Sequence, residues 1–287
     1  MKITAAQRAE KAIDACLLGR ACAIMVYNTL VIMQQKRGQP GMCSHIQVKH
    51  AVILASGYGK RMQKASSFPS KPMTPICQKP LISYIIDLLI DTGIEKIYIV
   101  YHSVTADVLN LIDYFPSYAE HLEFIEEDVQ RGTLLTFSRI KEILAPPFIM
   151  AFEDVVARKS DFVDMMDFAR KYLAGGADLI VQTVRTPSIL SEKALLTENG
   201  RVIKYQKDGI IDRITCTQEI KYGGMVYLWL SSPFSIVDKH LSERQYRIST
   251  FLEQYIPTHS VFEMPIQDMW DVDTPKAVRL TEEILKN

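Results

Sequence analysis

The sequence predicts an α/β protein, a three-layer α/β/α sandwich around a mostly parallel, Rossmann-like sheet. From residue 51 onward, short and fully apolar runs alternate with amphipathic stretches, as in parallel strands joined by crossover helices. A glycine-rich loop follows the first apolar run directly, and ligands of open α/β sheets bind at the carboxyl ends of strands. These two observations together indicate a ligand-binding sheet that is covered on both faces.

The composition is that of an ordinary globular chain. Its 287 residues are 48% apolar and 23% charged, which suffices for one large α/β domain. Lys+Arg and Asp+Glu both number 33, so there is no basic excess to favour nucleic acid or a membrane surface. The 5 cysteines form no C-x-x-C pair and predict reduced thiols in a cytoplasmic protein. We therefore expect small-molecule partners, no nucleic acid and no membrane, and we leave a homo-oligomer open.

The first 46 residues differ in pattern from the rest. Polar residues interrupt the apolar run 16–33 and acidic residues precede it, which fits neither a membrane span nor a secretory signal. Pro40-Gly41 ends the predicted helix. The sequence thus divides into an N-terminal helical extension and linker, residues 1–46, and an α/β domain over residues 47–287. A translation start at an internal methionine, without the extension, is the alternative.

Apolar runs and helical spacing place the elements of the domain in order. After Pro187 the pattern becomes hairpin-like, with Glu198-Asn199-Gly200 as a turn between two short strands. The expected strands are 51–54, 97–100, 122–125, 148–151 and 179–181, and the expected helices are 81–89, 104–114, 133–144, 162–172 and 275–285.

The glycine loop reads Leu54-Ala55-Ser56-Gly57-Tyr58-Gly59-Lys60-Arg61. Glycines at such a place let backbone N–H groups approach phosphate oxygens, and the Lys-Arg pair adds positive charge. A P-loop needs four residues between its glycines, and a dinucleotide fingerprint needs a third glycine where Met62 stands, so both are excluded. Between a tight turn and a phosphate site of another kind, the adjoining charges and the strand position favour phosphate.

This loop and the segment after it, Ser70-Lys71-Pro72 and Gln78-Lys79-Pro80-Leu81, resemble the opening of the sugar-1-phosphate pyrophosphorylases, a nucleotidyltransferase family. Further blocks follow in the family's order, and the resemblance spans about residues 48–287. It implies the nucleotide-diphospho-sugar transferase type of fold. It also implies an enzyme that condenses a nucleoside triphosphate with a sugar 1-phosphate into an NDP-sugar and pyrophosphate. The further blocks are RGTLLTF, PFIMAFEDVV, YQKDG, YGGMVYL and WDVDTPKAVRLTEE.

The resemblance also implies roles for single residues. Arg61 would hold the β and γ phosphates, and Lys71, in an exposed phosphate site, would neutralise the α-phosphate. Asp154 and Asp271 would hold Mg²⁺, brought together at the carboxyl ends of two parallel strands. Without the resemblance, Lys71 reads as a solvated surface lysine, Asp154 as a helix N-cap and Asp271 as a turn residue. The implied nucleotide-binding residues are Leu54, Ala55, Gly57, Gly59, Glu127, Gly132 and Thr133, and the implied acceptor-binding residues are Lys207 and Gly224.

Four positions depart from the family pattern. Glu153 replaces a glycine beside the metal site, Gln206 replaces a glutamate, Tyr222 replaces an asparagine, and Glu127 stands where relatives read the base with a glutamine. These changes leave the base and the acceptor open. A cytidylyltransferase for a polyol or choline-type phosphate, and a catalytically silent nucleotide-binding homologue, are therefore the alternatives.

Overall fold

The computed structural model describes most of the chain from Gln47 onward. The described residues are 47–57, 59, 61–62, 70–128, 131–160, 165, 168–169, 172, 175–185, 193–206 and 217–286. The predicted extension, residues 1–46, lies outside them, as do Lys207 and part of the predicted helix 162–172. Gln47 and the residues after it form one structural unit. Within the described ranges, no helix is both long enough and apolar enough to cross a membrane.

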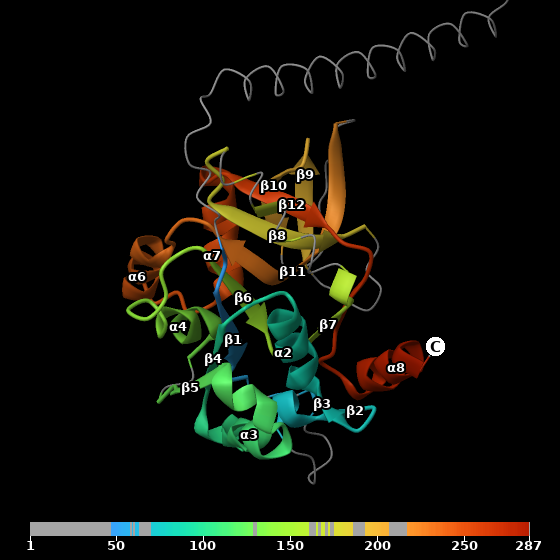
Figure 1. Ribbon diagram of the computed structural model, residues 1–287. Helices are drawn as coiled ribbons and strands as arrows, with labels where there is room; N and C mark the ends of the chain where they lie inside the picture. The colour runs from blue at the N-terminus through green and yellow to red at the C-terminus, as the bar shows by residue number, and fades with distance from the viewer. Residues whose placement is uncertain are drawn as a thin grey trace, which may run out of the picture. The chain divides into compact units, whose positions relative to one another are not determined.

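A nine-stranded sheet, in the order β5-β4-β1-β6-β11-β8-β12-β10-β9, organises the unit (Figure 1). Its strands include all five that the sequence predicts, and the predicted hairpin is β9–β10, with positive φ at Asn199 (52°) and Gly200 (78°). The strands are β1 (His50–Ala55), β4 (Lys96–Tyr101), β5 (Leu122–Glu126), β6 (Phe148–Phe152), β8 (Leu179–Val184), β9 (Ala194–Glu198), β10 (Arg201–Gln206), β11 (Gln218–Trp229) and β12 (Val261–Pro265).

The sheet combines a parallel half with a mixed half. β5, β4, β1 and β6 pair in parallel, as expected. β11 is antiparallel to β6 and β8, and β10 is antiparallel to β12 and β9. The described strands therefore point the same way except for β11 and β10, but most pairings beyond β6 are antiparallel. The sequence pattern predicts the common direction of the strands. It does not predict that β11 lies between β6 and β8, because β11 pairs with strands far away along the chain.

Two predicted helices are shorter or tighter than expected. The segment 104–114 is mainly the 3-10 turn η2 (Ser103–Asn110), since Thr105 has a non-helical φ of −121°, followed by the short helix α3 (Leu111–Tyr114). The predicted helix 133–144 ends early, as α4 (Thr133–Ser138). The other helices and 3-10 turns are η1 (Lys71–Met73), α2 (Leu81–Asp91), η3 (Pro116–Glu120), α6 (Phe234–Ser242), α7 (Ile248–Tyr255), η4 (Ile256–Thr258) and α8 (Pro275–Lys286).

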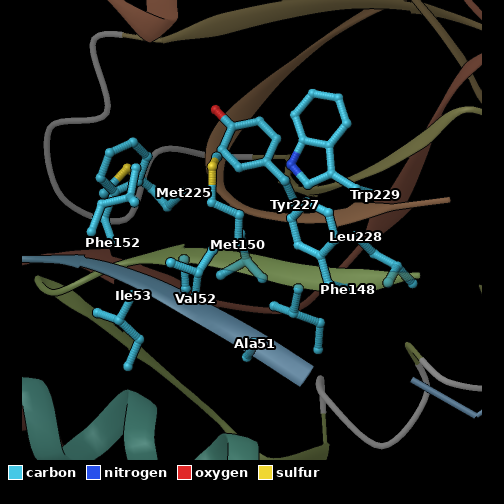
Figure 2. Packing of buried hydrophobic residues seen from close by; sticks show 14 of the residues in the cluster. Ala51, Val52, Ile53, Phe148, Met150, Phe152, Met225, Tyr227, Leu228 and Trp229 are labelled. Carbon is cyan, nitrogen blue, oxygen red and sulfur yellow. The ribbon is translucent and has the colours of Figure 1, made fainter. Parts of the chain in front are cut away.

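The main core packs around the middle of the sheet. Successive residues of a strand point to opposite faces, so the complete burial of Ala51, Val52 and Ile53 means that both faces of β1 are covered. Figure 2 shows side chains of β1, β6 and β11 packed together, with Trp229 among them. Trp229 stacks on Phe137 of α4 at a centroid distance of 5.6 Å. These contacts hold α4 against the sheet.

A second, smaller core lies outside the nine-stranded sheet. It is built by two small two-stranded sheets, β2 (Pro75–Ile76) with β3 (Lys79–Pro80) and β7 (Val155–Ala157) with β13 (Met269–Asp271), together with α2 and α8. We call this group the minor core; its buried members are Ile76, Leu81, Val156, Trp270, Val272 and Ala277. It supports the segments that carry Lys71, Asp154 and Asp271.

Candidate active site

The glycine loop leaves β1 at the carboxyl edge of the parallel half. Gly59 has φ 55°, and a Cβ there would lie 2.8 Å from the Cβ of Lys71, so only glycine fits this approach. A Cβ on Gly57 would lie 3.4 Å from Glu153 Oε1. The loop is thus packed directly against a cation and a carboxylate, while Leu54 and Ala55 are buried at the end of β1.

Lys71 is a buried cation. Its side chain is 11% exposed, its Nζ forms an ion pair with Asp154, and Glu153 Oε1 lies 3.7 Å away. Burial alone would lower the pKa of Lys71, but the charges of Asp154, Glu153 and Asp271 raise it above its ordinary value. Both expectations of an accessible Lys71, in an exposed phosphate site or as a solvated surface lysine, are therefore wrong. Its nine-tenths buried ammonium is fixed in position by carboxylates.

Asp154 and Asp271 meet through the β7–β13 sheet. Antiparallel pairing sets Asp271 opposite Val155, and the Val272 N–H donates to the Asp154 carbonyl at 2.9 Å. Their carboxyl groups are near enough for each to shift the pKa of the other. The structure thus brings the pair together, as expected, although the local contact is made by this small sheet. Asp154 lies in a turn and Asp271 in a strand, so neither the N-cap nor the turn reading holds.

The pKa values of the two carboxyl groups are shifted in opposite directions. Burial and the charge of Asp154 raise the pKa of Asp271 to about 8. Burial would also raise the pKa of Asp154, but the Lys71 charge and hydrogen bond lower it below its ordinary value. Asp154 Oδ1 and Asp271 Oδ1 are both buried without a hydrogen-bond partner among the described residues. Such oxygens are costly to bury unless something binds them.

This donor set fits a divalent cation. Carboxylate oxygens are the ligands that Mg²⁺ prefers, and the ion commonly takes one or two carboxylates together with phosphate and water. Across the described ranges, no group of three or more His, Cys, Asp and Glu side chains could hold a metal by itself. Two carboxylates with unpartnered oxygens thus fit an ion whose remaining ligands are phosphate and water.

Lys193 is a second lysine of this cluster, and the sequence analysis missed it. Its Nζ lies 5.1 Å from the centroid of the Phe152 ring and 2.7 Å from Met225 Sδ. Its charge lowers the pKa values of Glu153, Asp154 and Asp271. Burial raises the pKa of Glu153 to about 7, against the opposing charge of Lys71. A lone lysine before a short strand is usually solvated, so no feature of the sequence singled out Lys193.

Arg61 stands at the rim. Its side chain is 67% exposed and forms an ion pair with Asp273, two residues beyond Asp271. Asp273 was not among the predicted site residues, although it lies in the same block as Asp271. The contact joins the glycine loop to the segment after β13 and leaves most of the guanidinium exposed.

The predicted base-binding residues Glu127, Gly132 and Thr133 follow β5 along the chain. Glu127 follows β5 and is buried, and its Oε2 accepts a hydrogen bond from Thr136 Oγ1 at 2.7 Å. A Cβ on Gly132 would lie 2.4 Å from the Tyr246 carbonyl oxygen, at a φ of 145°. Thr133 Oγ1 accepts from the Ile248 N–H at 3.2 Å, which uses that hydroxyl to hold α7. Of the predicted acceptor residues, Gly224 lies within β11 and Lys207 lies outside the described residues.

The described residues thus define an α/β protein with a buried lysine and two carboxylates beside the glycine loop. Residues 50–190 match the family described as nucleotidyl transferase. The chain is similar to the bifunctional protein GlmU of Methanococcus vannielii, 34% identical over 118 residues, which cover 41% of this chain and 27% of that protein. It is similar to mannose-1-phosphate guanyltransferase beta-A of Xenopus laevis, 23% identical over 236 residues, which cover 79% of this chain and 61% of that protein.

A solved structure supports the fold. The inositol-1-phosphate CTP transferase from T. maritima matches 83% of this chain and 95% of its own, with a TM-score of 0.65 at 16% identity. The family match over residues 50–190 and the shared α/β fold agree with the resemblance seen in the sequence. It spans about a quarter of the length of the archaeal relative and less than two thirds of the amphibian one.

Proposed function

We propose that the protein is a nucleotidyltransferase that joins a nucleoside triphosphate to a sugar 1-phosphate and releases pyrophosphate. The observation that carries the proposal is the Lys71–Asp154 ion pair, which lies beside Asp271 and directly against the glycine loop. A buried cation and a pair of carboxylates with free oxygens are the groups that displacement at phosphorus requires. Such reactions need charge neutralisation and positioning more than covalent chemistry from the protein.

Each residue has a part in this mechanism. The loop at Gly57 and Gly59 presents backbone N–H groups to the triphosphate, and Lys71 neutralises the charge that accumulates on the α-phosphate. Arg61, being exposed, exchanges its contact with Asp273 for the β and γ phosphates and the leaving pyrophosphate. Asp154 and Asp271 would hold Mg²⁺, which supplies further charge neutralisation at the phosphates. The acceptor's own phosphate is the nucleophile.

Further features complete the proposal. Lys193, whose Nζ lies over the Phe152 ring, is a second cation near the carboxylates, and we assign it to the phosphate of the acceptor. A three-layer α/β/α arrangement is supported by the burial of both faces of β1 and β6.

A cytoplasmic location is supported by the free thiol of Cys77. A homo-oligomer and the absence of nucleic-acid partners remain parts of the proposal on the composition alone.

The test is a substrate screen that detects pyrophosphate. Purified full-length protein with Mg²⁺ is offered each nucleoside triphosphate together with hexose 1-phosphates, inositol 1-phosphate or phosphocholine. We expect release that needs both substrates and Mg²⁺, is strongest with a hexose 1-phosphate, and is strongly reduced at low Mg²⁺ in Asp271→Asn. The matched substitution Asp113→Asn, at an exposed aspartate of α3, should change nothing. Failure of every pair would contradict the enzyme and leave a silent nucleotide-binding homologue.

A further inference from the structure

Glu127 is a buried carboxylate for which the phosphate chemistry has no use. The residue is 1% exposed, and its Oε1 has no hydrogen-bond partner among the described residues. A buried acceptor without a donor costs free energy, so this oxygen is suited to a ligand that supplies the donor. Glu127 directly follows β5, at the same edge of the sheet as the glycine loop.

A chain of hydrogen bonds fixes the direction of this carboxylate. Thr136 Oγ1 donates to Glu127 Oε2 at 2.7 Å, and Ser56 Oγ lies 2.9 Å from Thr136 Oγ1. A carboxylate only accepts, so the single Thr136 proton goes to Glu127 and Ser56 donates to Thr136. The Glu127 N–H also donates to the Tyr101 carbonyl at 2.7 Å. The carboxylate is therefore held rigidly from the glycine loop and from α4.

The position of Glu127 in the sheet corresponds to the base end of a nucleotide. The phosphate-binding groups follow β1 and β6, whereas Glu127 follows β5, which is separated from β1 by β4. Neighbouring strands lie about 4.8 Å apart, so the strand ends are separated on the scale of a nucleoside. The inference rests on the proposed function in this respect, because it takes the triphosphate to lie at the glycine loop.

We propose that Glu127 selects guanine, and that the nucleotide is GTP. The Watson–Crick edge of guanine carries two adjacent donors, N1–H and the N2 amino group, which match a carboxylate. Uracil and thymine carry one N–H between two carbonyl oxygens, which would face the carboxylate oxygen to oxygen. Cytosine and adenine carry one amino group next to a ring acceptor. Oε2 keeps a second lone pair beside its bond to Thr136, so both carboxylate oxygens can accept from guanine.

Direct binding of GTP, ITP and UTP tests this inference. ITP differs from GTP only in lacking the N2 amino group, so it isolates one of the two donors. In the full chain with Mg²⁺ and no acceptor, calorimetry should give a Kd for GTP roughly tenfold or more below those for ITP and UTP. Glu127→Gln should reduce both preferences to a few-fold. Glu126→Gln, the same change at the exposed neighbour, should preserve them.

The outcomes separate this inference from the proposed function. Equal or tighter binding of UTP by the native chain, or an unchanged GTP preference in Glu127→Gln, would overturn the guanine assignment. Thr136→Val, which removes the anchoring donor, should weaken the preference as well and serves if Glu127→Gln does not fold. GTP preference without pyrophosphate release would support the assignment and contradict the enzyme. Pyrophosphate release with UTP and not GTP would do the reverse.

Discussion

Lys71 and Arg61 supply positive charge to the glycine loop in different ways. Lys71 is nine-tenths buried among carboxylates, whereas Arg61 is two-thirds exposed and has Asp273 as its ion-pair partner. The buried cation is positioned before any ligand binds, and the exposed one is free to change partners. The two residues therefore differ in what their removal does to stability.

Arg61→Ala should remove activity and leave stability unchanged. An exposed ion pair contributes little to folding, while a phosphate contact that strengthens in the transition state is worth roughly a hundredfold in rate. We expect kcat/KM to fall by about that factor, with an unfolding temperature equal to that of the native protein. Turnover within a few-fold of normal would show that Arg61 does not contact the phosphates.

Lys71→Ala should lose both activity and stability. Removing one partner of a buried ion pair leaves the other carboxylate uncompensated, at a cost of about 3–5 kcal/mol. We expect a clear loss in chemical denaturation, together with a rate loss at least as large as that of Arg61→Ala. Lys49→Ala, which breaks an exposed pair with Glu95, is the matched control and should cost under about 1 kcal/mol. Equal stability in the two variants would contradict the buried environment of Lys71.

At the scale of elements, the apolar runs were sufficient to predict β1, β4, β6 and β8, because buried strands leave continuous apolar sequence. The edge strand β5 is only partly buried and was predicted from an interrupted apolar run. The β7–β13 sheet was not predictable. Each of its strands has three residues, and Val155-Val156-Ala157 reads as a continuation of the apolar run before it. The position of Asp271 beside Asp154 followed from the family's pattern, and its hydrogen-bonded register came only from the structure. Lys193 and Asp273 were missed because their roles depend on such long-range contacts.

Because the β7–β13 sheet brings Asp154 and Asp271 together, we expect both residues to determine the Mg²⁺ requirement. Asp154→Asn and Asp271→Asn should each raise the Mg²⁺ concentration for half-maximal activity by roughly tenfold or more, because a charged oxygen ligand is replaced by an amide. The double variant should show less than the sum of the two effects, since both residues act on one ion. Magnesium titrations of pyrophosphate release measure this directly. Fully additive effects would indicate that the two residues do not share an ion.

At the scale of the whole molecule, every described site residue lies after residue 47. A chain that begins at Gln47 should therefore fold, bind nucleotide and keep the kcat/KM of the full chain. Circular dichroism, thermal unfolding and the pyrophosphate assay compare the two forms. A shortened chain that is folded but inactive would show that residues 1–46 contribute to the site or to an active assembly.

The buried acids also make the stability of the molecule depend on pH. The pKa of Asp271 is raised to about 8 and that of Glu153 to about 7, in both cases mainly by burial. Between about pH 4 and 8 the folded state thus binds protons that the unfolded chain has released, so stability falls as pH rises. We expect the unfolding temperature in EDTA to fall across this window. Mg²⁺ should restore it more at about pH 8 than at about pH 6, and this gain should be lost in Asp271→Asn.

We expect the minor core to unfold separately from the rest of the molecule. Ile76, Val156, Trp270 and Ala277 belong to a cluster separate from the main core, and it joins α8 to the segments that carry Lys71, Asp154 and Asp271. A small separate cluster is a natural unit of partial unfolding, and amide hydrogen exchange reports such units individually. Detachment of α8 would dismantle the carboxylate pair while the nine-stranded sheet stays folded. A ligand that bridges the two aspartates would slow exchange in α8, which makes the C-terminal helix a reporter of occupancy at a site it does not line.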